Sequence, residues 1–281
     1  MTRILQILAF ALGIITVLAS CQIDNAELSD ESVVMQNPFA GMRWGGAMWQ
    51  TGQWDVPGRY AVVPDPETGD KAVQKFTLRE GDCAWKDCQY NSGRFEVTEN
   101  IWDKPRFGER RQPEEAWYSW EVRLDEGTLY GRNQPMGPII LGQFKQQYIN
   151  CPLLTFRHQS GHNDSSLLVS LARDTGLEPP RDCASSPEQV VGTMPELIGR
   201  WARVEMFIRW SSGDDGWVDV YLDGEQRMAY KGPTCARNCQ RIFRKYGIYF
   251  ANQRGGTPLT EINAFYRNVG RASKREGLPR Q

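Results

Sequence analysis

The chain has little histidine, almost no net charge and no apolar run long enough to span a bilayer well. Its 281 residues include two histidines, His158 and His162, and neither a His-Glu-x-x-His zinc motif nor a Gly-x-Ser-x-Gly nucleophile elbow. The 33 basic and 34 acidic residues leave a net charge of −1. No overall positive field would therefore attract nucleic acid, and we expect no nucleic-acid partner.

The amino terminus resembles a bacterial lipoprotein signal. Arg3 precedes an apolar stretch from Ile4 to Val17, and Leu-Ala-Ser leads into Cys21. We expect residues 1–20 to be removed as a signal peptide, Cys21 to carry the lipid, and residues 21–37 to form a lipid-anchored tether. Residues 38–281 would then form one domain. Because Gln22 is not the aspartate that commonly marks retention at the inner membrane, the resemblance implies an exported lipoprotein of the outer membrane.

Six cysteines remain besides Cys21, an even number that suits disulfides in an oxidising compartment. Short spacings favour the pairs Cys83–Cys88 and Cys235–Cys239, which leaves Cys151 with Cys183. A zinc site built from the four closely spaced cysteines is the alternative. In an exported chain, spacings of four and three intervening residues favour disulfides.

Short alternating strands separated by Gly, Pro, Asn and Asp make up most of the chain. Residues 117–124, 202–210 and 217–222 each place apolar side chains on one face, Asp223-Gly224 predicts a two-residue hairpin turn, and 226–230 is the return strand. Residues 175–195 are expected to form a long loop. With no βαβ rhythm, the pattern predicts an all-β, concanavalin-like jelly-roll sandwich of two antiparallel sheets with a concave substrate groove.

The run Lys-Tyr-Gly-Ile-Tyr at 245–249 is the strongest local candidate for a site. In an extended chain, Lys245, Gly247 and Tyr249 share one face, and Tyr246 and Ile248 share the other. The missing side chain at Gly247 predicts a notch that could hold a sugar ring. The alternative is an ordinary half-buried strand with a solvated lysine.

Several motifs follow one another along the chain: Val-Pro-Asp-Pro-Glu-Thr-Gly at 63–69, Arg-Glu-Gly-Asp at 79–82, Arg-Phe-Glu at 94–96, Ile-Leu-Gly-Gln-Phe-Lys at 140–145, Trp-Ala-Arg-Val-Glu at 201–205, Val-Asp-Val-Tyr-Leu-Asp-Gly at 218–224, Lys-Tyr-Gly-Ile-Tyr at 245–249 and Phe-Tyr-Arg-Asn-Val at 265–269. In this order they resemble the polysaccharide lyases related to heparin lyase I and glucuronan lyase. The resemblance implies a secreted lyase that cleaves a uronic-acid-containing, anionic polysaccharide by β-elimination, without a cofactor. A non-catalytic glycan-binding sandwich lipoprotein is the alternative.

Elimination needs a group that stabilises the uronate carboxylate, a base for the C5 proton and an acid for the leaving oxygen. The resemblance implies that Tyr249 is the acid, and also a candidate base, with Lys245 as its charge partner. Arg94 would bind the carboxylate beside Glu96, with a surface ion pair between Arg94 and Glu96 as the alternative. Gln143 would also contact substrate.

The chain departs from the family pattern at Lys145, where relatives often have a histidine. Lys145 shares a face with Gln143 and would either neutralise the carboxylate or act as a base if burial lowers its pKa. His158, on the next expected strand, is a second candidate for the missing imidazole.

Three further residues, Trp217, Tyr221 and Asn268, are predicted to bind substrate. Basic stretches at 104–111, 237–245 and 271–275 would favour an anionic polymer if two of them met in one cleft. We predict no catalytic metal. Asp164 and Asp174 could belong to a structural calcium site, although turn chemistry explains them equally well. We expect a monomer.

Overall fold

The computed structural model describes residues 58–79, 81–83, 86–90, 92–98, 112–127, 138–147, 149, 151–158, 166–172, 185–236, 239–250 and 261–280, and the backbone of 33–34. The strands are β1 (Val33–Val34), β2 (Tyr60–Pro64), β3 (Ala72–Arg79), β4 (Gly93–Thr98), β5 (Glu115–Leu124), β6 (Ile139–Gln146), β7 (Pro152–His158), β8 (Ser166–Ala172), β9 (Ser185–Thr193), β10 (Ala202–Arg209), β11 (Trp217–Leu222), β12 (Glu225–Lys231), β13 (Ile242–Phe250) and β14 (Glu261–Ala272). Helical segments are α1 (Lys86–Gln89), η2 (Met194–Glu196) and η4 (Arg275–Gly277). The described chain is almost entirely β, as predicted.

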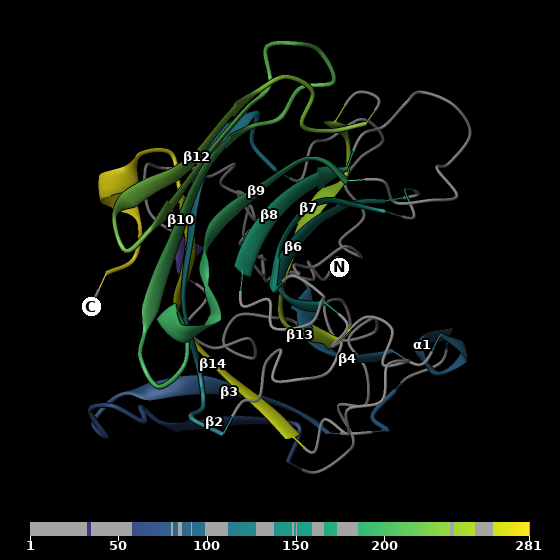
Figure 1. Ribbon diagram of the computed structural model, residues 1–281. Coiled ribbons are helices and arrows are strands. Elements are labelled where there is room, and N and C mark those ends of the chain that lie inside the picture. The colour runs from purple at the N-terminus through teal and green to yellow at the C-terminus, as the bar shows by residue number, and fades with distance from the viewer. Residues whose placement is uncertain are drawn as a thin grey trace, which may run out of the picture.

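Two antiparallel sheets pack face to face (Figure 1). An eight-stranded sheet has the order β12-β11-β10-β5-β14-β3-β2, with β1 paired to β14. A six-stranded sheet has the order β4-β13-β6-β7-β8-β9. Consecutive strands such as β6 to β9 pair in turn, whereas β5 pairs with β10 and β14, and β13 pairs with β4 and β6, across long sequence separations. Two antiparallel sheets connected in this way are typical of a jelly roll and confirm the predicted fold class.

The apolar core lies between the sheets because the strands alternate as the sequence predicts. Tyr118, Trp120, Val122 and Leu124 of β5 are all buried in the core cluster. The alternate residues of β10 and β11 join them, so both of these strands carry their polar side chains on the outer face, meaning the face away from the other sheet. Asp223 and Gly224 both have positive φ, as the predicted two-residue turn requires.

The prediction of a loop over 175–195 is wrong at its carboxyl-terminal end. Residues 185–193 form β9, the edge strand of the six-stranded sheet, and η2 follows it. Pro187 lies in β9 without disrupting the sheet because an edge strand has backbone amides that need no ladder partner. The prolines and serines that suggested a loop are therefore compatible with this particular strand.

Disulfides join Cys83 to Cys88 and Cys235 to Cys239, as predicted. Cys151 is also disulfide-bonded, and its predicted partner Cys183 lies outside the described residues. Residues 1–20, Cys21 and most of the tether also lie outside them. In the described part of the chain, no helix has the length and apolar character needed to cross a membrane.

Gly247 lets β13 approach β4 closely, and this is its structural role. Its φ is +130°, and a Cβ placed there would lie 2.4 Å from the carbonyl oxygen of Phe95 and 2.8 Å from the Cα of Glu96. The Gly247 carbonyl accepts a hydrogen bond of 2.8 Å from the buried Tyr266 hydroxyl. The missing side chain therefore makes room for the neighbouring strand, and the predicted sugar-sized notch is wrong.

We predict that Gly247→Ala lowers the free energy of unfolding by about 3 kcal/mol, because strain at positive φ and overpacking against β4 each cost about 1–3 kcal/mol. Denaturant unfolding followed by tryptophan fluorescence measures the change. Gly81→Ala is the matched control, since Gly81 has φ +78° and nothing within 4 Å of an added Cβ. Equal losses from the two substitutions would show that close packing at Gly247 contributes nothing.

Candidate active site

Polar side chains from three adjacent strands meet on the outer face of the six-stranded sheet. In β13, Lys245 and Tyr249 point outward while Tyr246, Ile248 and Phe250 join the core. The backbone register pairs Tyr249 with Arg94 of β4, and Lys245 with Gln143 of β6. The sequence-predicted residues of β4, β13 and β6 therefore come together.

Glu96 links the three strands. It lies opposite Gly247, and its Oε1 accepts a hydrogen bond from Gln143 Nε2, one strand beyond β13. From this position its side chain extends past β13 to β6. Its other oxygen, Oε2, lies 3.7 Å from both Lys245 Nζ and Arg94 Nη1. A carboxylate that is 1% exposed thus lies between two cations, which makes the alternative of a surface ion pair wrong.

Arg94 is held on two sides. Its Nε and Nη2 each lie 3.1 Å from a carboxylate oxygen of Asp87, a two-pronged contact that fixes the guanidinium plane. The guanidinium carbon lies 4.0 Å from the centroid of the Tyr249 ring. Burial alone would lower the pKa of Arg94, but Glu96 and Asp87 raise it above its ordinary value. Arg94 is therefore a permanent cation stacked on Tyr249, whereas Lys245, the predicted charge partner of Tyr249, pairs with Glu96.

The two lysines of the cluster have lowered pKa values. Burial lowers the pKa of Lys145 to about 8, and the nearby charges of Lys245 and Arg94 act in the same direction. Burial also lowers the pKa of Lys245, although Glu96 opposes this effect. Near neutral pH, Lys145 is thus the group in the cluster best placed to gain or lose a proton.

His158 does not reach this face. It is fully buried, and it shares the core-facing side of β7 with Leu154 and Phe156. The register pairs it with Leu167, a core residue of β8. The outward Arg157 and Thr155 lie one and three positions before His158, and side chains at odd offsets in a strand lie on opposite faces, so the imidazole points inward.

Trp217, Tyr221 and Asn268 lie on the outer face of the eight-stranded sheet, across the sandwich from Lys245. Trp217 and Tyr221 alternate with the core residues of β11, and Asn268 donates a 2.7 Å hydrogen bond to Glu121 of β5. They therefore cannot contact a substrate bound at Tyr249. The basic stretches at 237–245 and 271–275 are separated in the same way, because Lys245 and Arg275 lie on opposite faces of the molecule.

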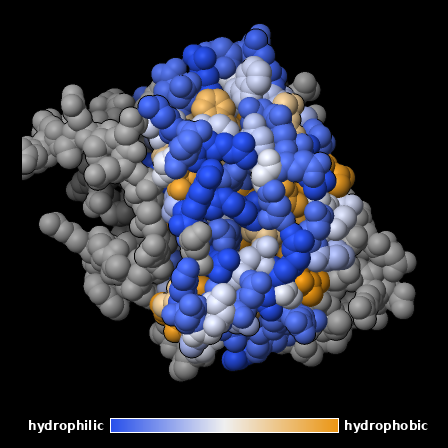
Figure 2. All heavy atoms as spheres, turned by 90° about the vertical axis from the view of Figure 1, so that its left-hand side faces the viewer, coloured by the Kyte–Doolittle hydropathy of each residue, from blue (hydrophilic) through white to orange (hydrophobic). Residues whose placement is uncertain are grey.

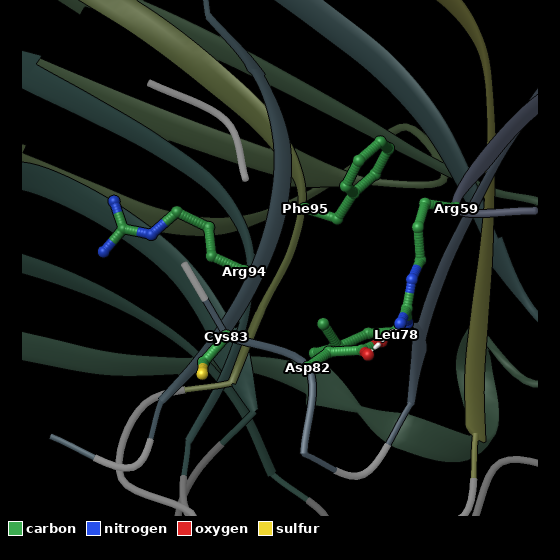
Figure 3. A pocket seen from close by; sticks show the side chains of 6 residues that line it. All are labelled: Arg59, Leu78, Asp82, Cys83, Arg94 and Phe95. Carbon is green, nitrogen blue, oxygen red and sulfur yellow. Dashed lines mark hydrogen bonds and ion pairs between the residues drawn. The ribbon is translucent and has the colours of Figure 1, made fainter. Parts of the chain in front are cut away.

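A small cavity beside β4 does not extend the site. It measures about 10 Å³ and is lined by Arg59, Leu78, Asp82, Cys83, Arg94 and Phe95. Figure 3 shows that Arg94 points away from the other labelled side chains, while Arg59 pairs with Asp82. This space suits about one water molecule and is too small for a sugar.

Asp87 is a site residue that the sequence analysis missed. It lies in α1, a four-residue helix next to the Cys83–Cys88 disulfide, and it reaches Arg94. Burial raises its pKa, against the effect of Arg94. The sequence signal that could have identified Asp87 is its position in the short loop closed by the Cys83–Cys88 disulfide. This disulfide fixes an acidic side chain beside β4.

Among the described residues, no three His, Cys, Asp or Glu side chains lie close enough together to hold a metal ion. Asp164 and Asp174, the residues considered for calcium, lie outside the described residues.

Residues 45–266 match the family model described as polysaccharide lyase. The fold is similar to endo-β-1,4-glucuronan lyase from the fungus Trichoderma reesei, with a TM-score of 0.61 and 16% identity over 83% of this chain and 95% of that one. A second similar structure is alginate lyase PA1167 from Pseudomonas aeruginosa, with a TM-score of 0.48 and 15% identity over 72% of this chain and 83% of that one. A sequence comparison with curated proteins found no match.

Proposed function

Because the chain belongs to the polysaccharide lyase family, we propose that this lyase cleaves a uronic-acid-containing polysaccharide by β-elimination. The observation that carries the proposal is the cluster around Tyr249. The cations Arg94 and Lys245 balance the carboxylates Asp87 and Glu96, so the cluster carries no net negative charge when Lys145 is neutral and one positive charge when Lys145 is protonated. A uronate carboxylate suits such a site. The structural neighbour with the TM-score of 0.61 is named for a uronan substrate, which agrees with this class.

In the proposed reaction, a base removes the C5 proton of the uronate. The electron pair forms a double bond between C4 and C5, and the bond from C4 to the glycosidic oxygen breaks. The Tyr249 hydroxyl donates its proton to that oxygen. Arg94 lies against the Tyr249 ring, and its positive charge stabilises the phenolate that forms. The Arg94 and Lys245 cations also stabilise the charge that develops on the carboxylate.

Lys145 is our candidate for the base. A neutral amine accepts a proton, and a pKa of about 8 leaves a useful fraction of Lys145 neutral near pH 7 to 8. Its strand face, shared with Gln143, points to the same side as Tyr249. After the reaction, the proton on Lys145 can return to solvent or to the Tyr249 phenolate, which restores both groups.

The proposed location is an exported lipoprotein of the outer membrane, anchored through Cys21. The two disulfides among the described residues support export, because structural disulfides form in oxidising compartments. The tether of residues 21–37 would then hold the enzyme near the membrane while the polymer diffuses to it.

The first test is absorbance at about 235 nm, where the conjugated double bond of the elimination product absorbs. We expect a rise with at least one member of a panel of uronans and glycosaminoglycans. We expect Tyr249→Phe to lose at least about 100-fold in kcat and to keep substrate affinity within a few-fold, because only the proton donor is removed.

Tyr230→Phe is the matched control, since the Tyr230 hydroxyl contacts the Pro233 carbonyl on the other sheet. It should keep full activity. Near-normal turnover by Tyr249→Phe would remove Tyr249 from the role of acid. No absorbance rise with any polymer would count against elimination itself.

A pH profile tests Lys145 as the base. If neutral Lys145 accepts the proton, kcat/KM should rise with pH and level off above about 8, because the pKa of Lys145 is lowered to about 8. Lys145→Arg should lose about 100-fold or more, since a guanidinium stays protonated at every accessible pH. The opposite pattern, with a rate that falls above pH 8 and an active Lys145→Arg variant, would make Lys145 a carboxylate ligand instead.

Lipid attachment is tested by metabolic labelling with a radioactive fatty acid in a bacterial host. The wild-type chain should take up label and fractionate with the outer membrane. Cys21→Ser should take up none and leave the membrane fraction, while activity per folded molecule stays unchanged. Label that persists in Cys21→Ser would place the lipid elsewhere or refute the anchor.

A further inference from the structure

The outer face of the eight-stranded sheet carries a charged hollow that takes no part in the reaction proposed above. Its volume is about 420 Å³, within the range of small-molecule sites. Figure 2 shows hydrophilic side chains gathered over the middle of this face. The residues that the argument uses are Glu121, Arg203, Glu205, Arg267, Arg275 and Arg280.

The floor of the hollow is a fixed network of charges. Glu205 is 2% exposed and accepts hydrogen bonds from Arg275, at 2.7 and 3.0 Å, and from Arg203, at 2.9 Å. Burial alone would raise the pKa of Glu205, but these hydrogen bonds hold it below its ordinary value. Glu121 accepts from Arg203 at 3.1 Å and from Arg267 at 2.7 Å. Both carboxylates orient the arginines around them.

The arginines still have hydrogen-bond donors to offer. Nη2 of Arg203 is buried and has no hydrogen-bond partner among the residues that the structure describes. Arg280 is 57% exposed, and its Nη2 lies 3.9 Å from Glu205 Oε1, beyond hydrogen-bonding distance. The lining holds four arginines and three carboxylates, so one positive charge is in excess. An anionic group of a ligand can reach the exposed Arg280 guanidinium directly.

An aromatic cluster supports one side of the hollow. The guanidinium carbon of Arg275 lies 4.0 Å from the centroid of the Tyr221 ring and 5.4 Å from that of Trp117. Trp117 in turn packs against Tyr221 and Phe207, with centroids 5.7 and 5.4 Å away. The rings lie outside the lining of the hollow and hold the Arg275 guanidinium in place over the sheet.

We propose that this hollow is a second, non-catalytic site that binds a uronate unit of an acidic polysaccharide. The inference rests on the proposed function for the class of polymer, while the site itself stands on its own geometry. Arginine forks match a planar carboxylate, and the half-exposed Asp223 carboxylate can accept hydrogen bonds from sugar hydroxyls. The three lining carboxylates disfavour a densely sulfated chain. Holding one polymer segment here would raise the local concentration of another at Tyr249.

The experiment is a calorimetric titration of the full chain carrying Tyr249→Phe, which prevents turnover. The probes are tetrasaccharides of β-1,4-glucuronan and of alginate. We expect two sites per chain for at least one probe. Adding Arg94→Ala should remove one site, and adding Arg275→Ala with Arg280→Ala should weaken the other at least tenfold. Arg280→Ala alone, at an exposed position, should weaken it by a smaller factor with no change in melting temperature.

Arg209→Ala is the matched control, because Arg209 also lies on β10 and pairs with Glu114 and Asp215 outside the hollow. It should leave both sites unchanged. One or two sites in the parent chain that Arg275→Ala with Arg280→Ala does not weaken would show that the network only holds the carboxyl-terminal segment against the sheet. A single site that Arg275→Ala with Arg280→Ala weakens and Arg94→Ala leaves unchanged would support the hollow and count against substrate binding at Tyr249. Neither readout depends on absorbance at 235 nm, so failure of the lyase assay and failure of this site are distinguishable.

Discussion

The close approach of β4 and β13 at Gly247 is the constraint on which the site depends. This approach places Glu96 opposite Gly247, and from there Glu96 reaches across β13 to Gln143 and places its second oxygen between Arg94 and Lys245. Any larger residue at Gly247 would meet the β4 backbone first. The same glycine thus sets the spacing of two strands and the position of the carboxylate that holds the cations together.

That carboxylate explains how cations can remain on a largely buried surface. Removing Lys245 from water is costly, and the cost is offset only when a partner lies close by and its own hydrogen bonds are satisfied. Glu96 supplies the partner, and Gln143 supplies its hydrogen bond. Lys145, which lies farther along the same face, has its pKa lowered by burial and by the other cations. One network therefore yields both fixed cations and a lysine that can exchange a proton near neutral pH.

Strand alternation made most of the fold and the outward set of β13 predictable, because a period of two needs only the local sequence. The partners of each strand were not predictable in this way. His158 and Tyr221 were assigned to the site even though each lies in a clearly alternating strand. Alternation shows which side chains share a face, but it does not show which sheet, or which face of that sheet, binds the substrate. Asp87 was missed because its role depends on a disulfide loop folding back on β4. The function of Gly247 was misread for the same reason, since the β4 backbone that fills its space comes from a distant part of the chain.

The two charged faces differ in a way that assigns them different tasks. Around Tyr249, burial lowers the pKa of Lys145 and Lys245, so the proton affinity of the site is adjusted for chemistry. Around Glu205, arginine hydrogen bonds hold the pKa of the carboxyl below its ordinary value. In the proposed arrangement this network holds an anionic polymer, while the proposed base Lys145 lies on the other sheet. We infer that the sandwich separates holding from cleaving by placing each on its own sheet.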